Sequence, residues 1–152
     1  QEEEAGSARL GNRDIQVNYY IAQAYMTLNK PDEAKKYYDR AISLPSGRVN
    51  IMNYYKGLSY ASLGDKTNAK KTFDAMIAEA NRRIENIDNS EVGTIFGSRE
   101  AENMQRSLNY TIRGLGYKGL KQADKAEDDL RKALEYSNNN LWAKVEVEFT
   151  TI

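Results

Sequence analysis

The sequence contains no cysteine and no histidine. Without cysteine it has no disulfide, no thiolate metal site and no cysteine nucleophile, and it gives no indication of redox compartment. Without histidine it lacks the commonest general base at neutral pH and the commonest zinc ligand, which leaves carboxylates, Lys, Tyr, Ser and Thr for any chemistry. We therefore expect a protein that is not an enzyme, with no catalytic residues, no cofactor and no metal site.

Excess charge and long apolar runs are also missing. The 22 Lys and Arg residues equal the 22 Asp and Glu residues, and no basic run interleaves with aromatic residues as a nucleic-acid surface requires. No apolar run approaches the roughly 18 residues that cross a bilayer, and residues 1–10 are acidic and polar, unlike an export signal. We expect neither nucleic acid nor a membrane as a partner. The first residue is Gln instead of Met, so we also expect a piece of a longer protein.

Most of the chain has the apolar spacing of helices. Apolar side chains recur three and four residues apart, as on one face of a helix, and in the first predicted helix they are Ile15, Tyr19, Ala22, Tyr25 and Met26. Pro31 suits the first turn of a second helix, because the missing N–H costs nothing there. Ser98 is the expected N-cap of a later helix.

One pattern occurs three times: a small residue, a Tyr three places on, then a Leu, then small and apolar residues on a second helix. The three sets are Ala22, Tyr25, Leu28, Ala34, Tyr38, Ala41; Gly57, Tyr60, Leu63, Ala69, Phe73, Met76; and Gly114, Tyr117, Leu120, Ala126, Leu130, Ala133. The small residue lets two helices approach closely, and we expect the Tyr and Leu to fill the gap between them.

This pattern resembles the tetratricopeptide repeat (TPR) family, whose period is about 34 residues; Ala22 and Gly57 are about 35 residues apart. The resemblance implies an all-α fold, a right-handed solenoid of helical hairpins with about seven helices. It departs from the family at the usual Trp position, which holds Asn18, Asn53 and Tyr110. The interval from Gly57 to Gly114 is longer than the first by about 22 residues, which locates an insertion.

We predict a flexible lead-in at residues 1–12 and a single TPR-like domain at residues 13–152. Its predicted parts are repeat one at about 14–47, repeat two at about 50–87, an insertion loop at about 88–97, repeat three at about 98–137 and a closing helix at about 140–149. Residues 145–149 alternate apolar and acidic side chains, which also fits a strand. We favour the helix, because an isolated strand has no ladder partner in a helical array.

The family resemblance also implies a concave groove, lined by first-helix residues, where ligands lie. The predicted groove residues are Tyr19, Gln23, Tyr54, Leu58, Thr111, Leu115 and Lys118. The alternative is that the aromatic residues among them only stabilise neighbouring first helices. Tyr25, Tyr60 and Tyr117 are assigned to packing. The basic clamp with which some relatives hold acidic chaperone tails is missing, since Tyr19, Gln23 and Tyr55 occupy its places, so we expect a neutral or apolar ligand.

Two further apolar patches need an explanation. Val92, Ile95 and Phe96 lie in the insertion loop, and they either fold back onto the long helices or contact another chain. Trp142 and Phe149 near the C-terminal end are candidates for self-association.

Two motifs that suggest chemistry have simpler explanations. Gly114, Gly116 and Gly119 form a G-x-G-x-x-G sequence, but they lie inside a predicted helix, where the dinucleotide fingerprint has no meaning. Asp128 and Asp129 are placed on a charged solvent face.

The expected function is a non-enzymatic protein–protein interaction module that binds a peptide or a neighbouring domain of its own longer chain. The alternative is a structural spacer that forms a homodimer through its C-terminal end.

Overall fold

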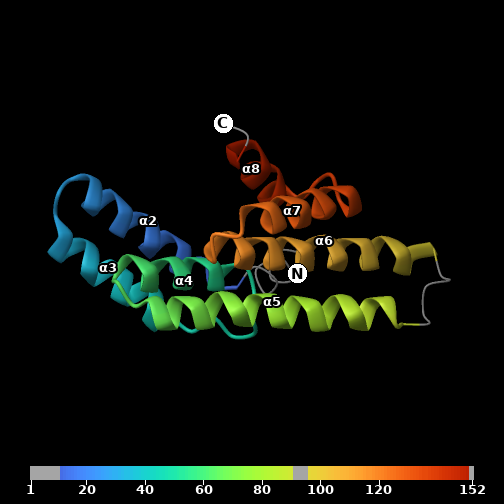
Figure 1. Cartoon of the computed structure of the whole chain (residues 1–152), viewed down its shortest axis with the longest axis horizontal. Helices are drawn as coiled ribbons and strands as arrows, with labels where there is room; N and C mark the ends of the chain where they lie inside the picture. The colour runs from blue at the N-terminus through green and yellow to red at the C-terminus, as the bar shows by residue number, and fades with distance from the viewer. Residues whose placement is uncertain (1–10, 91–95, 151–152) are drawn as a thin grey trace. The chain divides into compact units, whose positions relative to one another are not determined.

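The computed structural model describes residues 11–90 and 96–150, and within these ranges it contains seven α-helices and no strand (Figure 1). The helices are α2 (Asp14–Thr27), α3 (Pro31–Ser43), α4 (Met52–Ser62), α5 (Lys66–Asp88), α6 (Phe96–Gly119), α7 (Ala123–Tyr136) and α8 (Leu141–Thr150). The expectation of an all-α protein is confirmed. The chain divides into two compact units, the first ending at Ala75 and the second beginning at Met76, and each is described by itself.

The helix starts agree with the sequence signals at most places. Asp14 begins α2, and Pro31 occupies the first turn of α3, where Asp32 and Glu33 favour the positive end of the helix dipole. The prediction for Ser98 is wrong, because α6 begins at Phe96 and Ser98 therefore lies inside its first turn. The C-terminal segment forms the helix α8, so the strand alternative at residues 145–149 is also wrong.

The same turn joins the two helices of each hairpin. Asn29, Gly64 and Lys121 all have a left-handed backbone, with φ of 57°, 81° and 64°. In each repeat the next residue donates its backbone N–H to the carbonyl of the repeat's Tyr at 2.9 Å, which is the pattern of a Schellman cap. The repeat in the sequence is therefore also a repeat in backbone geometry.

In the first unit, α3 packs against α2, and α4 packs against both helices. The small side chains of Ala22 and Ala34 are fully buried with Tyr38, and half-buried Leu63 packs on this cluster from the end of α4. Gly57 allows close approach of α4 to α5, because a Cβ atom at this position would lie 2.6 Å from Cζ of Phe73. The small-residue positions of the pattern therefore do what the sequence predicted.

Leu28 corrects one expectation, since its side chain is 64% exposed and fills no gap within its own hairpin. Its counterpart in the second repeat, Leu63, packs on the hairpin before it. In the second repeat this Leu thus contacts the preceding hairpin, whereas the described chain places no hairpin before the first repeat.

We therefore expect L28A and L63A to differ in their effects on stability. L63A should lower the free energy of unfolding by about 1–2 kcal/mol, because it removes packed methyl groups. L28A should change it by less than about 0.5 kcal/mol. Urea unfolding followed by circular dichroism measures both, and equal losses would contradict the stacking role of this position.

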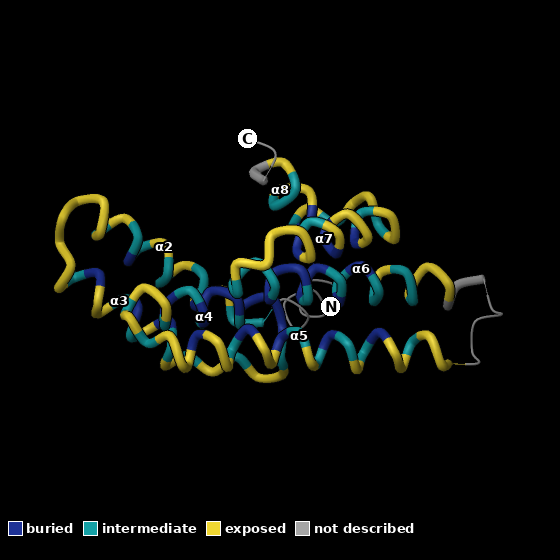
Figure 2. Tube along the Cα trace, viewed as in Figure 1, coloured by how far each residue is buried: buried dark blue, intermediate teal, exposed yellow. Residues whose placement is uncertain are grey.

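In the second unit, α7 packs against α6 and α8 packs against α7. The rings of Tyr110 and Tyr136 stack with their centroids 5.6 Å apart and their planes at 5°. Leu130 and Ala133 of α7 form a buried cluster with Ala143 of α8. Figure 2 shows the buried residues along α6 in dark blue. The usual Trp position of this repeat is thus filled by an aromatic pair that joins α6 to α7.

Candidate functional site

A cluster of tyrosines covers the first unit where α2 meets α4. We call Tyr19, Tyr20, Tyr38 and Tyr55 the tyrosine cluster. The ring of Tyr19 has its centroid 5.3 Å from that of Tyr20, 6.1 Å from that of Tyr38 and 5.6 Å from that of Tyr55. Tyr19 is half-buried and Tyr20 is exposed, so the cluster reaches the surface through α2.

Two glutamines of α2 hold the hydroxyl groups of this cluster. The Nε2 atom of Gln23 donates to the Tyr38 hydroxyl at 2.7 Å, and that of Gln16 donates to the Tyr55 hydroxyl at 3.1 Å. Burial raises the pKa of Tyr19 to about 12, with smaller contributions from Tyr38 and Tyr20. The Tyr19 hydroxyl therefore stays protonated at physiological pH and can both donate and accept a hydrogen bond.

The other predicted groove residues of the first unit are less accessible. Tyr54 is buried against Phe73 and Tyr55, with ring centroids 6.1 and 5.4 Å away. Leu58 is half-buried. Tyr54 therefore packs inside the protein. Of the groove residues predicted in this unit, the structure brings Tyr19 and Gln23 together near the surface.

In the second unit the predicted groove residues are buried or already paired with another part of the chain. Thr111 and Leu115 are buried. The Thr111 hydroxyl accepts a hydrogen bond from Nδ2 of Asn140 at 2.9 Å, and Lys118 forms an ion pair with Glu146 of α8. None of these three side chains projects freely from α6.

Asp129 corrects a further expectation, because it is buried and does not lie on a solvent face. Arg113 of α6 donates to both of its carboxylate oxygens at 2.7 Å, and to Oδ1 of Asn81 in α5 at 2.8 Å. The Arg113 guanidinium lies 5.0 Å from the centre of the Tyr110 ring. The hydrogen bonds with Asp129 raise the pKa of Arg113. Asp128 is exposed as predicted. The buried pair joins three helices and serves structure.

The remaining predicted patches are placed only in part. Val92 and Ile95 lie outside the described residues, and Phe96 begins α6 but its side chain also lies outside them. Trp142 is half-buried, and the side chain of Phe149 is not among those described. The exposed apolar side chains of α8 are instead Leu141 and Val145.

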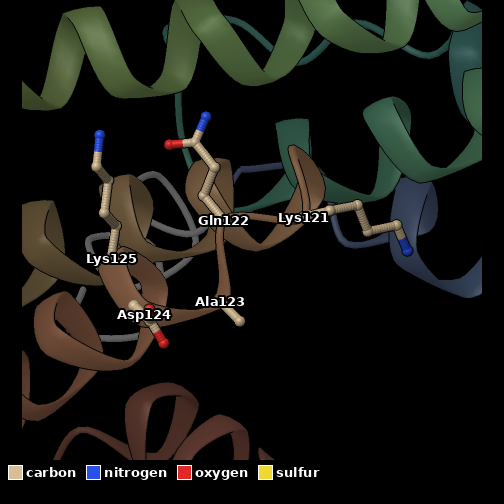
Figure 3. A pocket seen from close by; sticks show the side chains of 5 residues that line it. All are labelled: Lys121, Gln122, Ala123, Asp124 and Lys125. Carbon is tan, nitrogen blue, oxygen red and sulfur yellow. The ribbon is translucent and has the colours of Figure 1, made fainter.

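A hollow at the start of α7 is lined by residues 121–125, as Figure 3 shows. The carboxylate of Asp124 lies in the first turn of α7, and its negative charge disfavours the binding of an anion at this helix end. We assign no ligand to this hollow. Within residues 11–90 and 96–150, no group of carboxylates is arranged to hold a metal ion, and no helix has the length and apolarity of a membrane span.

Sequence reasoning missed Tyr20 and Tyr38 as members of the tyrosine cluster, and it missed Gln16 as a residue that hydrogen-bonds to the cluster. The spacing of Gln16, Tyr19 and Gln23 on one face of α2 carried the signal for Gln16. Tyr38 comes from α3, and its place beside Tyr19 depends on how the hairpin closes.

Paired helices joined by a recurring turn define an all-α repeat protein. A sequence model of the tetratricopeptide repeat matches residues 15–47 and 109–140, and a second model of the same repeat matches residues 53–80. The chain belongs to the tetratricopeptide repeat family, and as a member it is a protein-interaction module.

Comparison with solved structures finds two similar TPR domains. The first TPR domain of human RPAP3, solved by NMR, is 18% identical, with 91% of each chain covered and a TM-score of 0.36. The first TPR domain of Spaghetti (RPAP3), bound to the HSP90 peptide SRMEEVD, is 17% identical, with 94% of each chain covered and a TM-score of 0.35. A search of curated proteins finds no match.

Proposed function

We propose that this module is not an enzyme and that it binds a peptide or a neighbouring protein domain through the α2 face that carries Tyr19 and Gln23. The observation that supports this most is the half-buried Tyr19 ring, which three other tyrosines hold in place. A rigid aromatic side chain loses little entropy on binding, and its protonated hydroxyl adds a directional hydrogen bond.

The ligand that suits this face is neutral or apolar. Gln16, Tyr19, Gln23 and Met26 follow one another at helical spacing, and none carries a formal charge. We do not propose the acidic chaperone peptide as a ligand, because Tyr19, Gln23 and Tyr55 stand where family members use basic side chains. Nucleic acid and membranes are not among the partners that we propose.

The test compares two single lysines on α2. Met26 is 49% exposed on the proposed face, and Val17 is 50% exposed roughly two and a half turns away, on the opposite side of the helix. We expect M26K to lose partners that wild type retains from a lysate of the source cell, because a lysine charge opposes an apolar ligand. V17K should retain them, with capture read by mass spectrometry.

Circular dichroism of both variants serves as the folding control. If V17K and M26K lost the same partners, the α2 face would not be the binding surface. Y19F then tests the hydroxyl group, and a loss of affinity in Y19F would assign it a direct hydrogen bond with the ligand.

The second candidate function is a self-associating spacer, and it is favoured by the 71% exposure of Leu141 together with exposed Val145 on α8. Concentration-dependent mass separates the two candidates. A monomer supports the peptide-binding module, whereas a stable dimer that L141K disrupts supports the spacer.

A further inference from the structure

The helix α8 contacts the face of α6 that the family pattern assigns to ligands. The Nδ2 atom of Asn140, the residue before α8, donates to the Ser107 hydroxyl at 2.8 Å and to the Thr111 hydroxyl at 2.9 Å. Further along, Glu146 of α8 pairs with Lys118. Two of the three predicted ligand positions on α6, Thr111 and Lys118, thus have a partner in α8 or in the residue before it.

The two sides of α8 differ, because its inner side contacts α7 and its outer side is exposed. Ala143 is fully buried against Leu130 and Ala133 of α7. Oδ1 of Asn140 also accepts the Ala143 backbone N–H at 3.1 Å, which caps the helix. Leu141 and Val145 face away from this contact.

The described part of α8 depends on the surface beneath it for its fold, because its ten residues would be marginal in water as an isolated helix. The Lys118–Glu146 pair is partly exposed, so it adds little to the stability of the contact and mainly sets the orientation of α8.

We propose that this surface, defined by Ser107, Thr111, Lys118, Leu130 and Ala133 and called here the α8 seat, is a helix-binding site that α8 occupies in cis. The partner is a helix with α8-like chemistry, which has an Asn cap, a small residue and an acidic residue at the spacing of Asn140, Ala143 and Glu146. It binds by displacing α8. The inference rests on the proposed function as an interaction module, and it concerns a surface separate from the α2 face.

The test uses the full chain and a fluorescent synthetic peptide of residues 138–150 as the probe. A143D introduces a charge into the contact with Leu130 and Ala133 and should release α8 while leaving the seat intact. We expect the peptide to bind A143D at least tenfold more tightly than wild type in fluorescence anisotropy. The matched control is L141D, which adds the same charge to the exposed side of α8 and should bind the peptide as weakly as wild type.

Equal peptide affinity of A143D and L141D, with α6 and α7 still helical by circular dichroism, would overturn the proposal. If A143D does not fold, E146K replaces it, because a lysine opposite Lys118 repels α8 at a partly exposed position. E146K should gain affinity for the peptide, and the charge reversal K118E/E146K should lose that gain. No gain in E146K would also overturn the proposal. The peptide experiment tests the α8 seat, and the M26K and V17K comparison tests the α2 face. A negative result for one surface therefore does not decide the proposal for the other.

Discussion

Replacing Arg113 with Met should lower the free energy of unfolding by about 3 kcal/mol, because it leaves the buried Asp129 carboxylate without its counterion. The Asp129 side chain is 5% exposed and receives two hydrogen bonds from Arg113. The substitution also removes the hydrogen bond with Asn81 of α5 and the contact with the Tyr110 ring. Urea unfolding followed by circular dichroism measures the loss.

The matched control for R113M is R131M, which breaks an Arg–Glu pair on the exposed face of α7. Exposed ion pairs contribute less than about 1 kcal/mol, so R131M should be nearly neutral. The double variant R113M/D129L should recover much of the stability that R113M loses, because it removes both charges together. If R113M and R131M were equally stable, the pair would not hold α5, α6 and α7 together.

Replacing Gly57 with Ala should be the second large effect, with a loss of at least about 2 kcal/mol through overpacking. The new Cβ atom would lie 2.6 Å from Cζ of Phe73 and closer still to Cε1, so the ring or the helix must move. This cost exceeds the roughly 1 kcal/mol that Ala gains over Gly within a helix. Thermal unfolding of G57A against wild type gives the result.

Gly114 provides the control, since it holds the same position in the third repeat with more room. A Cβ atom there would lie 3.0 Å from Cγ of Leu130 and 3.2 Å from Cδ2. The gain in helix propensity offsets much of this contact, so G114A should stay within about 1 kcal/mol of wild type. G57A/F73L should regain part of the stability lost in G57A, and a G57A variant as stable as wild type would refute the close contact.

The sequence did not predict which of the groove positions are accessible to a ligand. A position that faces a groove in the family was predicted for Tyr54 and Thr111, but Tyr54 packs on Phe73 and Thr111 accepts a hydrogen bond from Asn140. Tyr19 has the same position in repeat one and remains half exposed. Equivalent positions differ because each has different neighbours from distant parts of the chain.

The sequence by itself determined the helices, their turns and the family. Apolar spacing, Pro31 and the small residues Ala22, Gly57 and Gly114 act within a few turns of the chain, and local rules suffice for them. Only the tertiary structure decided that Asp129 is buried with Arg113 and that Leu28 is exposed. It also decided that Asn140 contacts Thr111 and that α8 contacts Lys118. These outcomes depend on which side chains from remote helices fill a space or neutralise a charge, and no local pattern encodes that.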